Sequence, residues 1–137
     1  MKVAVKTLTF STREKFELVN ITDEVEKAVS ESGIINGICL VFAPHATGAI
    51  VANENEKGLI RDILDHISQL FPPGKNWLHN RIDDNAHAHV ASSIIGASLT
   101  LPVINGRVVR GTWQDVFFVE MDGPRTNRRV IIEVLGE

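Results

Sequence analysis

The hydrophobic pattern of the chain changes period along its length, and this change restricts the folds open to it. Alternating or continuous apolar stretches, typical of β-strands, occupy both ends, whereas apolar residues at helical spacing occupy the middle. Strands and helices are therefore segregated and do not alternate as βαβ units. This arrangement predicts an α+β fold in which a β-rich half packs on two or three helices.

The strands are expected where β-branched and aromatic residues gather between turn signals. The first two, joined as an opening hairpin through the polar residues 11–14, are followed by a near-continuous apolar run that indicates a strand buried on both faces. Asn105-Gly106 is typical of a type I′ turn and predicts a second hairpin. The expected strands span 2–10, 15–20, 34–42, 99–104, 107–111, 116–121 and 129–135.

Three helices are expected in the middle of the chain. The first begins at Thr22 or Asp23, which can cap it, and ends at Gly33. The second covers 54–71, has the strongest helical period, and is stopped by the segment 72–74, Pro-Pro-Gly. The third begins near residues 83–84 and ends at Gly96.

Size and charge exclude several classes of protein. The 137 residues suit one domain, 1–137, and the net charge of −3 provides no field that would gather nucleic acid or an anionic membrane. No run of apolar residues is long enough to span a bilayer. The lone Cys39, within an apolar stretch, is expected to be a buried thiol. With no targeting segment, we expect a cytoplasmic protein.

The chain contains five histidines, and an ordinary globular composition does not explain this number. His45 follows a predicted strand, where it is either a ligand or acid–base group or a turn histidine bonded to backbone. His79 lies in a loop and taken alone is a surface residue. His87 and His89 are two apart, so on a helix they point in nearly opposite directions and cannot serve one site. Periodicity leaves open which of them faces inward, and His66, between two aspartates, receives no role.

Polar residues near the histidines each have two interpretations. Glu54 is a ligand, an orienting group or a general base, or else a helix-start acid. Asp84 doubles as a helix cap. Gln114 binds a polar ligand or is a buried, satisfied amide. Arg125, on a turn, binds phosphate or carboxylate or is simply solvated. No phosphate-binding loop, dinucleotide fingerprint, nucleophile elbow or paired-cysteine motif is present.

Together these residues form an ordered set of motifs that resembles the YjbQ-like family from end to end. The most specific part is the run from Ser98 to Gln114, which ends in Gly-Thr-Trp-Gln. The full set comprises Pro44-His45-Ala46-Thr47, Asn53-Glu54, Trp77-Leu78-His79-Asn80, Asp84-Asn85-Ala86-His87-Ala88-His89, Gly111-Thr112-Trp113-Gln114 and Gly123-Pro124-Arg125. The resemblance implies a β-sandwich-like core packed with about three helices and a homotrimer.

The resemblance also implies a site and an activity. It selects His89 over His87 and gives His45, His79 and His89 as ligands of a divalent metal, zinc or alternatively magnesium. Family members are described as having a thiamine phosphate synthase activity, which joins a pyrimidine pyrophosphate to a thiazole phosphate. A metal or anion binder without catalysis and a metal-dependent hydrolase are the alternatives. The implied catalytic residues are Glu54, Asp84, Gln114 and Arg125, and the implied substrate contacts are Thr47, Asn85, Gln114 and Arg125. The family's second arginine corresponds to Arg128 or Arg129.

Overall fold

The computed structural model describes residues 1–137 and contains two antiparallel sheets, three α-helices and one short 3-10 helix. The chain therefore has the predicted α+β fold. None of its helices is long and apolar enough to cross a membrane. The elements in chain order are β1 (Lys2–Phe10), β2 (Glu17–Asn20), α1 (Thr22–Ser32), β3 (Gly37–Phe42), β4 (Gly48–Asn53), α2 (Lys57–Leu70), η1 (Leu78–Arg81), α3 (Ala86–Ile95), β5 (Ser98–Ile104), β6 (Arg107–Val108), β7 (Asp115–Glu120) and β8 (Arg128–Gly136).

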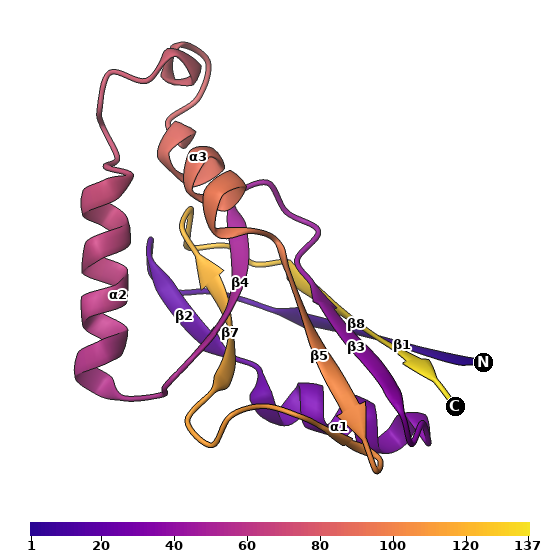
Figure 1. The fold of residues 1–137 in the computed structure, drawn as a ribbon. Helices are drawn as coiled ribbons and strands as arrows, with labels where there is room; N and C mark the ends of the chain where they lie inside the picture. Colours follow the sequence, from indigo (N-terminus) through magenta and orange to yellow (C-terminus); the bar gives the residue numbers. More distant parts are fainter.

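The larger sheet has the strand order β1-β8-β3-β5-β6 and the smaller one β2-β7-β4, and both curl around a shared core (Figure 1). Alternate residues of β3, such as Cys39 and Val41, point into this core and have no exposed surface. Phe118 of β7 enters from the smaller sheet and meets Phe10 of β1 edge-on, with ring centroids 5.3 Å apart. Burial raises the pKa of the Cys39 thiol to about 11, as expected for a buried cysteine.

The helices cover different parts of this core. The apolar face of α1 packs between the sheets through Val25 and Val29. The opposite face of the smaller sheet is covered by α3 and by the end of α2, where Ala88 and Phe71 belong to one apolar cluster with Val119. In Figure 1, α1 lies at one end of the molecule and α3 with η1 at the other, and the two chain termini lie side by side. Each end of the smaller sheet is therefore next to a different helix.

Two predictions about the first third of the chain are wrong. β1 and β2 do not form a hairpin, because β1 pairs with β8 while β2 pairs with β7 in the other sheet. The connection between them runs beside the β7–β8 connection, where Thr12 is buried and its backbone N–H donates to the carbonyl oxygen of Arg125 at 2.8 Å. Neither Thr22 nor Asp23 caps α1. Ile21 occupies the cap position without a side-chain hydrogen bond, and Asn20 accepts instead from the backbone N–H of Thr22 at 3.0 Å.

The strand predicted at 34–42 is β3, but only one of its faces is buried. Ile38 and Phe42, on the other face, are 43% and 38% exposed. The same outer face of the larger sheet carries exposed Val3 and Val5 of β1 and Ile104 of β5, so a broad apolar surface is open in the single chain. The hairpin at Asn105-Gly106 is confirmed, with φ angles of 53° and 76°. Strand β4 was not predicted from the sequence.

Candidate functional site

His45 lies in the connection from β3 to β4 and has one fixed hydrogen bond. Its Nε2 accepts from the backbone N–H of Arg129 at 2.9 Å, and its ring meets Phe118 edge-on with centroids 6.1 Å apart. Burial lowers the pKa of His45, and the positive charge of Arg128 lowers it further. The ring is therefore neutral at pH 7 and carries its proton on Nδ1. The turn histidine bonded to backbone is confirmed, and one ring N–H remains free.

Arg125 lies in the connection from β7 to β8 and is held by Asp122. Its Nε donates to the carbonyl oxygen of Asp122 at 3.0 Å and its Nη2 to the Asp122 carboxylate at 2.5 Å. Asn85, at the start of α3, donates to the same carboxylate at 2.8 Å. Burial acts to raise the pKa of Asp122, but the hydrogen bonds from Asn85 and Arg125 outweigh it and leave the pKa low. The predicted residues Asn85 and Arg125 therefore share one carboxylate.

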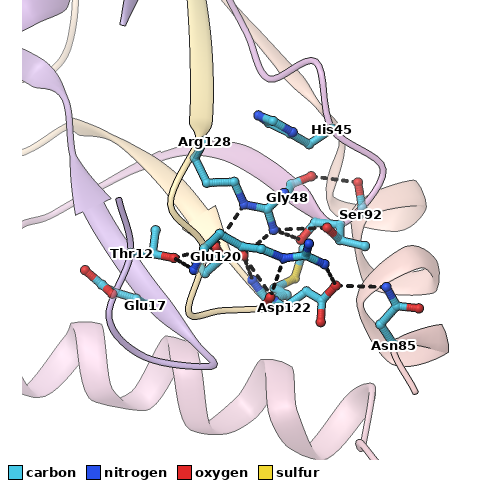
Figure 2. Close-up of polar contacts among 12 residues, drawn as sticks. Thr12, Glu17, His45, Gly48, Asn85, Ser92, Glu120, Asp122 and Arg128 are labelled. Atoms are coloured by element: carbon cyan, nitrogen blue, oxygen red, sulfur yellow. Dashed lines mark hydrogen bonds and ion pairs between the residues drawn. The ribbon is translucent and has the colours of Figure 1, made fainter. Parts of the chain in front are cut away.

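Below these residues, Glu120 and Arg128 form an ion pair that joins the two sheets (Figure 2). Glu120 at the end of β7 is 0% exposed, and Arg128 at the start of β8 is 4% exposed. Arg128 donates from Nε and Nη2 to the carboxylate, and its Nη2 also donates to the Thr47 hydroxyl at 3.0 Å. Thr12 donates at 2.7 Å to Oε1 of this carboxylate, the oxygen that also accepts from Arg128 Nε. The predicted substrate contact Thr47 therefore orients Arg128.

Both oxygens of the Glu120 carboxylate accept hydrogen bonds. Besides Thr12 and Arg128, the backbone N–H groups of Met121 and Asp122 donate to it at 3.0 and 3.1 Å. Burial acts to raise the pKa of Glu120, and the hydrogen bonds from Arg128 and Thr12 outweigh it, so the pKa lies below its usual value. Glu120 is therefore ionised at neutral pH, and its role is structural, because its ion pair with Arg128 joins the two sheets.

The groups around His45 and Arg125 enclose a polar pocket of about 190 Å³. Its lining has no apolar residue and consists of His45, Arg125, Thr126, Asn127 and Arg128. Arg129 is exposed on the outer face of β8, so of the two candidates for the second arginine only Arg128 lines the pocket. The structure thus places two sequence-predicted residues, His45 and Arg125, in one pocket.

Glu54 and Gln114 lie at the opposite end of the smaller sheet. The register pairs Gly48 with Glu120 at one end of β4 and Asn53 with Asp115 at the other. Glu54 follows β4 and Gln114 precedes β7, so the six residues of β4, ~20 Å of strand, separate them from the His45 pocket. The Gln114 side chain accepts from the backbone N–H of Gly111 at 2.7 Å. Within one chain, Glu54 and Gln114 do not join His45 and Arg125.

His79 and His89 lie next to one another, as the resemblance implies. Their rings meet edge-on with centroids 4.8 Å apart, one ring on η1 and the other on α3. No group of three or more His, Cys, Asp or Glu side chains in the chain is placed to hold a metal ion. His45 therefore does not converge with the other two imidazoles within the chain. Asp84 is exposed just before α3, with its backbone N–H bonded to Asp83.

His87 faces inward, which resolves the ambiguity left by helical periodicity. It is 0% exposed, its Nε2 lies 2.9 Å from the carbonyl oxygen of Met121, and its ring packs on Phe16. Burial lowers its pKa, so it is a neutral core histidine. The half-buried His89, on the other side of α3, is the histidine that can reach a ligand.

The structural residues missed from the sequence are Thr12, Glu120 and Asp122. One signal was present, because Glu120 ends the apolar run Val-Phe-Phe-Val and a charge there needs a partner. Its partner Arg128 lies in the other sheet, so the sequence could not identify the pair.

Comparison with known proteins matches the chain to one family along nearly its whole length. The family model described as UPF0047 protein YjbQ-like matches residues 6–137. The chain belongs to this family. Among YjbQ-like relatives, a UPF0047 protein of Archaeoglobus fulgidus is 45% identical over 93% of this chain and 98% of the relative. The UPF0047 protein YugU of Bacillus subtilis is 39% identical over 96% and 99%.

Solved structures of similar proteins share the fold over the whole chain. A YbjQ-like protein of unknown function from Sulfolobus solfataricus is 54% identical, with a TM-score of 0.98 over 99% of both chains. A hypothetical protein from Aeropyrum pernix is 43% identical, with a TM-score of 0.92 over all of both chains. These likenesses support the α+β architecture throughout.

Proposed function

We propose that this YjbQ-like protein is a metal-binding enzyme for a small phosphorylated substrate, with a thiamine phosphate synthase-like activity. The observation that carries the proposal is that His45 and Arg125, singled out from the sequence, line one polar pocket with the nearly buried Arg128. A neutral imidazole and two guanidinium groups in one small pocket suit the transfer of a phosphate-bearing group.

In this reaction a bond forms between the thiazole nitrogen and the pyrimidine methylene carbon, and the carbon–oxygen bond to pyrophosphate breaks. The bonding electrons leave with the pyrophosphate, so charge develops on its oxygens. Arg125, fixed by Asp122, stabilises that charge without reorganising. His45 donates a proton or hydrogen bond from Nδ1, because its Nε2 already accepts from Arg129.

The chain supplies some, but not all, of the ligands that a divalent metal ion needs. His79 and His89 are the residues that would hold such an ion, because their rings lie next to one another with centroids 4.8 Å apart. The chain supplies no third ligand beside them. A bound zinc or magnesium ion would supply Lewis-acid stabilisation of phosphate oxygens.

We also propose the homotrimer. The open outer face of the larger sheet supports it, because Ile38 and Phe42 with Val3 and Val5 form an apolar surface that a monomer rarely exposes. Light scattering coupled to size exclusion is expected to give the mass of three chains. Ile38→Glu should reduce that mass, whereas Leu70→Glu, an equally apolar exposed position on α2, should not. A monomeric wild-type protein would contradict the trimer.

A non-catalytic binder of a metal or small anion is the second candidate. It is favoured by the position of Glu54, because the carboxylate expected to act as general base lies at the far end of β4. The same position weakens the hydrolase alternative, which needs that base beside the histidines.

The deciding experiment is formation of thiamine phosphate by the purified protein, with and without added zinc or magnesium. We expect product with wild-type protein and at least a tenfold lower rate with His45→Ala, consistent with the usual ~100-fold or larger contribution of acid–base groups. His66→Ala, a histidine on α2 outside the pocket, is the control and should keep the full rate. No product under any of these conditions rejects the enzyme and leaves the binder.

A further inference from the structure

We propose that the pocket lined by His45, Arg125 and Arg128 is an oxyanion subsite that binds a phosphate group through N–H donors the chain leaves free. This inference rests on the proposed function for its place in a substrate, and it names the part of that substrate which the pocket holds. The binding of the anion itself is independent of any catalysis.

Arg128 supplies the first free donor. Its Nε and Nη2 are committed to Glu120 and Thr47, whereas its Nη1 makes no hydrogen bond within the chain. That nitrogen is not among the buried unpartnered atoms, which are Asn85 Oδ1 and His87 Nδ1, so it still reaches the pocket. Because Arg128 as a whole is only 4% exposed and its guanidinium is bonded to Glu120 and Thr47, Nη1 is held in a fixed direction.

Arg125 and His45 supply two further free N–H donors. Arg125 uses Nε and Nη2 on Asp122 and keeps Nη1 free. His45 uses Nε2 as an acceptor, so its Nδ1–H is the donor it can offer to a ligand. Donors on three separate side chains suit a phosphate, which has at least three oxygens to accept them, better than a carboxylate with two.

The surrounding charges permit an anion. Both oxygens of Glu120 accept hydrogen bonds, and Oδ2 of Asp122 accepts from Asn85 and Arg125, so each carboxylate is paired with an arginine that lines the pocket. Asp83 is the further acid whose charge acts on Arg125, and it is exposed to solvent. The nearby Arg129 adds a positive charge. The residues that line the pocket include two arginines and no acid.

The size of the pocket selects a small group. Its volume of about 190 Å³ is below the ~300–1,000 Å³ typical of sites for drug-sized ligands. Four other hollows of the surface are larger, such as one of about 350 Å³ beside β1 and α1, but that one is mostly apolar. None of these four hollows is lined by a buried arginine.

The test is isothermal titration of the purified full-length protein with inorganic phosphate, and with acetate as the carboxylate comparison. Arg125→Gln removes one donor and leaves the Glu120–Arg128 pair intact. Arg128→Lys keeps a charge beside Glu120 but lacks Nη1. Each variant is expected to bind phosphate about 10- to 100-fold more weakly, the loss of one charge-assisted hydrogen bond. Arg107→Gln removes the same charge from β6 and should leave the affinity unchanged.

Circular dichroism verifies the fold of each variant, and Arg125→Gln decides the matter if Arg128→Lys does not fold. The proposal is overturned if wild-type protein does not bind millimolar phosphate, if acetate binds as tightly, or if Arg125→Gln binds like wild type. Phosphate binding without thiamine phosphate formation would support the subsite and refute the enzyme. Product formation without phosphate binding would do the reverse.

Discussion

Replacing Glu120 with Gln should cost this protein a large part of its folding stability. The substitution keeps the shape of the side chain but removes the charge that faces Arg128, which is 4% exposed. Removing one partner of a buried ion pair typically costs about 3–5 kcal/mol, because the other charge remains buried without compensation. The amide nitrogen of Gln would also face donors, the N–H groups of Met121 and Asp122 among them.

We therefore expect Glu120→Gln to lower the free energy of unfolding by about 3–5 kcal/mol in urea titrations at pH 7. Glu14→Gln is the matched control, because the exposed Glu14 side chain has no hydrogen bond, and it should change stability by less than about 0.5 kcal/mol. The double variant Glu120→Leu with Arg128→Met should lose less than Glu120→Gln alone, since no unpaired charge remains. A loss below about 1 kcal/mol for Glu120→Gln would refute the role given to the ion pair.

The pH dependence gives a second readout for the same residue. The pKa of Glu120 is lower in the folded protein than its ordinary value of 4.5. Its ionisation therefore stabilises the fold fully above that value, and this contribution is lost as the pH falls through the folded-state pKa. The stability difference between wild type and Glu120→Gln should stay constant from pH 7 to about pH 5 and shrink on further acidification. A difference that grows below pH 4.5 would contradict this sign.

Three further results are expected. The Cys39 thiol, which is 0% exposed and has a pKa of about 11, should react with a thiol reagent only at the rate of unfolding, and fast labelling of native protein would contradict its burial. Gly106→Ala should cost about 1 kcal/mol or more in thermal unfolding because φ is 76° there, whereas Asn105→Gly should cost little. His89→Ala should abolish the retained zinc measured by elemental analysis, whereas His87→Ala should keep it. Loss of zinc only in the His87→Ala variant would mean that the metal ligand is His87, on the other face of α3.

The fold was predictable where local pattern and burial agree. β1 alternates inward and outward residues along its whole length, and its predicted bounds match Lys2–Phe10. The helix end at Gly33 was equally clear, since its φ of 70° is one that glycine adopts without strain. β4 was missed because its six residues directly precede the stronger helical signal. The opening hairpin was wrong because a polar connection does not show which sheet the next strand will join.

The sequence predicted the chemical types of the site residues but not how they are arranged in space. His45 and Arg125 were identified as residue types with a function, and their proximity depends on the paths of β3 and β7 through different sheets. The separation of Glu54 from His45 has the same origin. They are only nine positions apart in sequence, but an extended β4 lies between them. Residues that are close in sequence, such as His45 and Glu54, can therefore lie far apart in the structure when an extended strand separates them.

The position of Arg128 couples stability to binding. The same guanidinium joins the two sheets through Nε and Nη2 and turns Nη1 toward the pocket. A variant that loosens the ion pair, such as Glu120→Gln, should therefore weaken phosphate binding although Glu120 does not line the pocket. Arg125 touches only Asp122 and the Thr12 loop, so its replacement should weaken binding with little change in unfolding. Comparing the two variants separates a donor in the pocket from the framework that positions it.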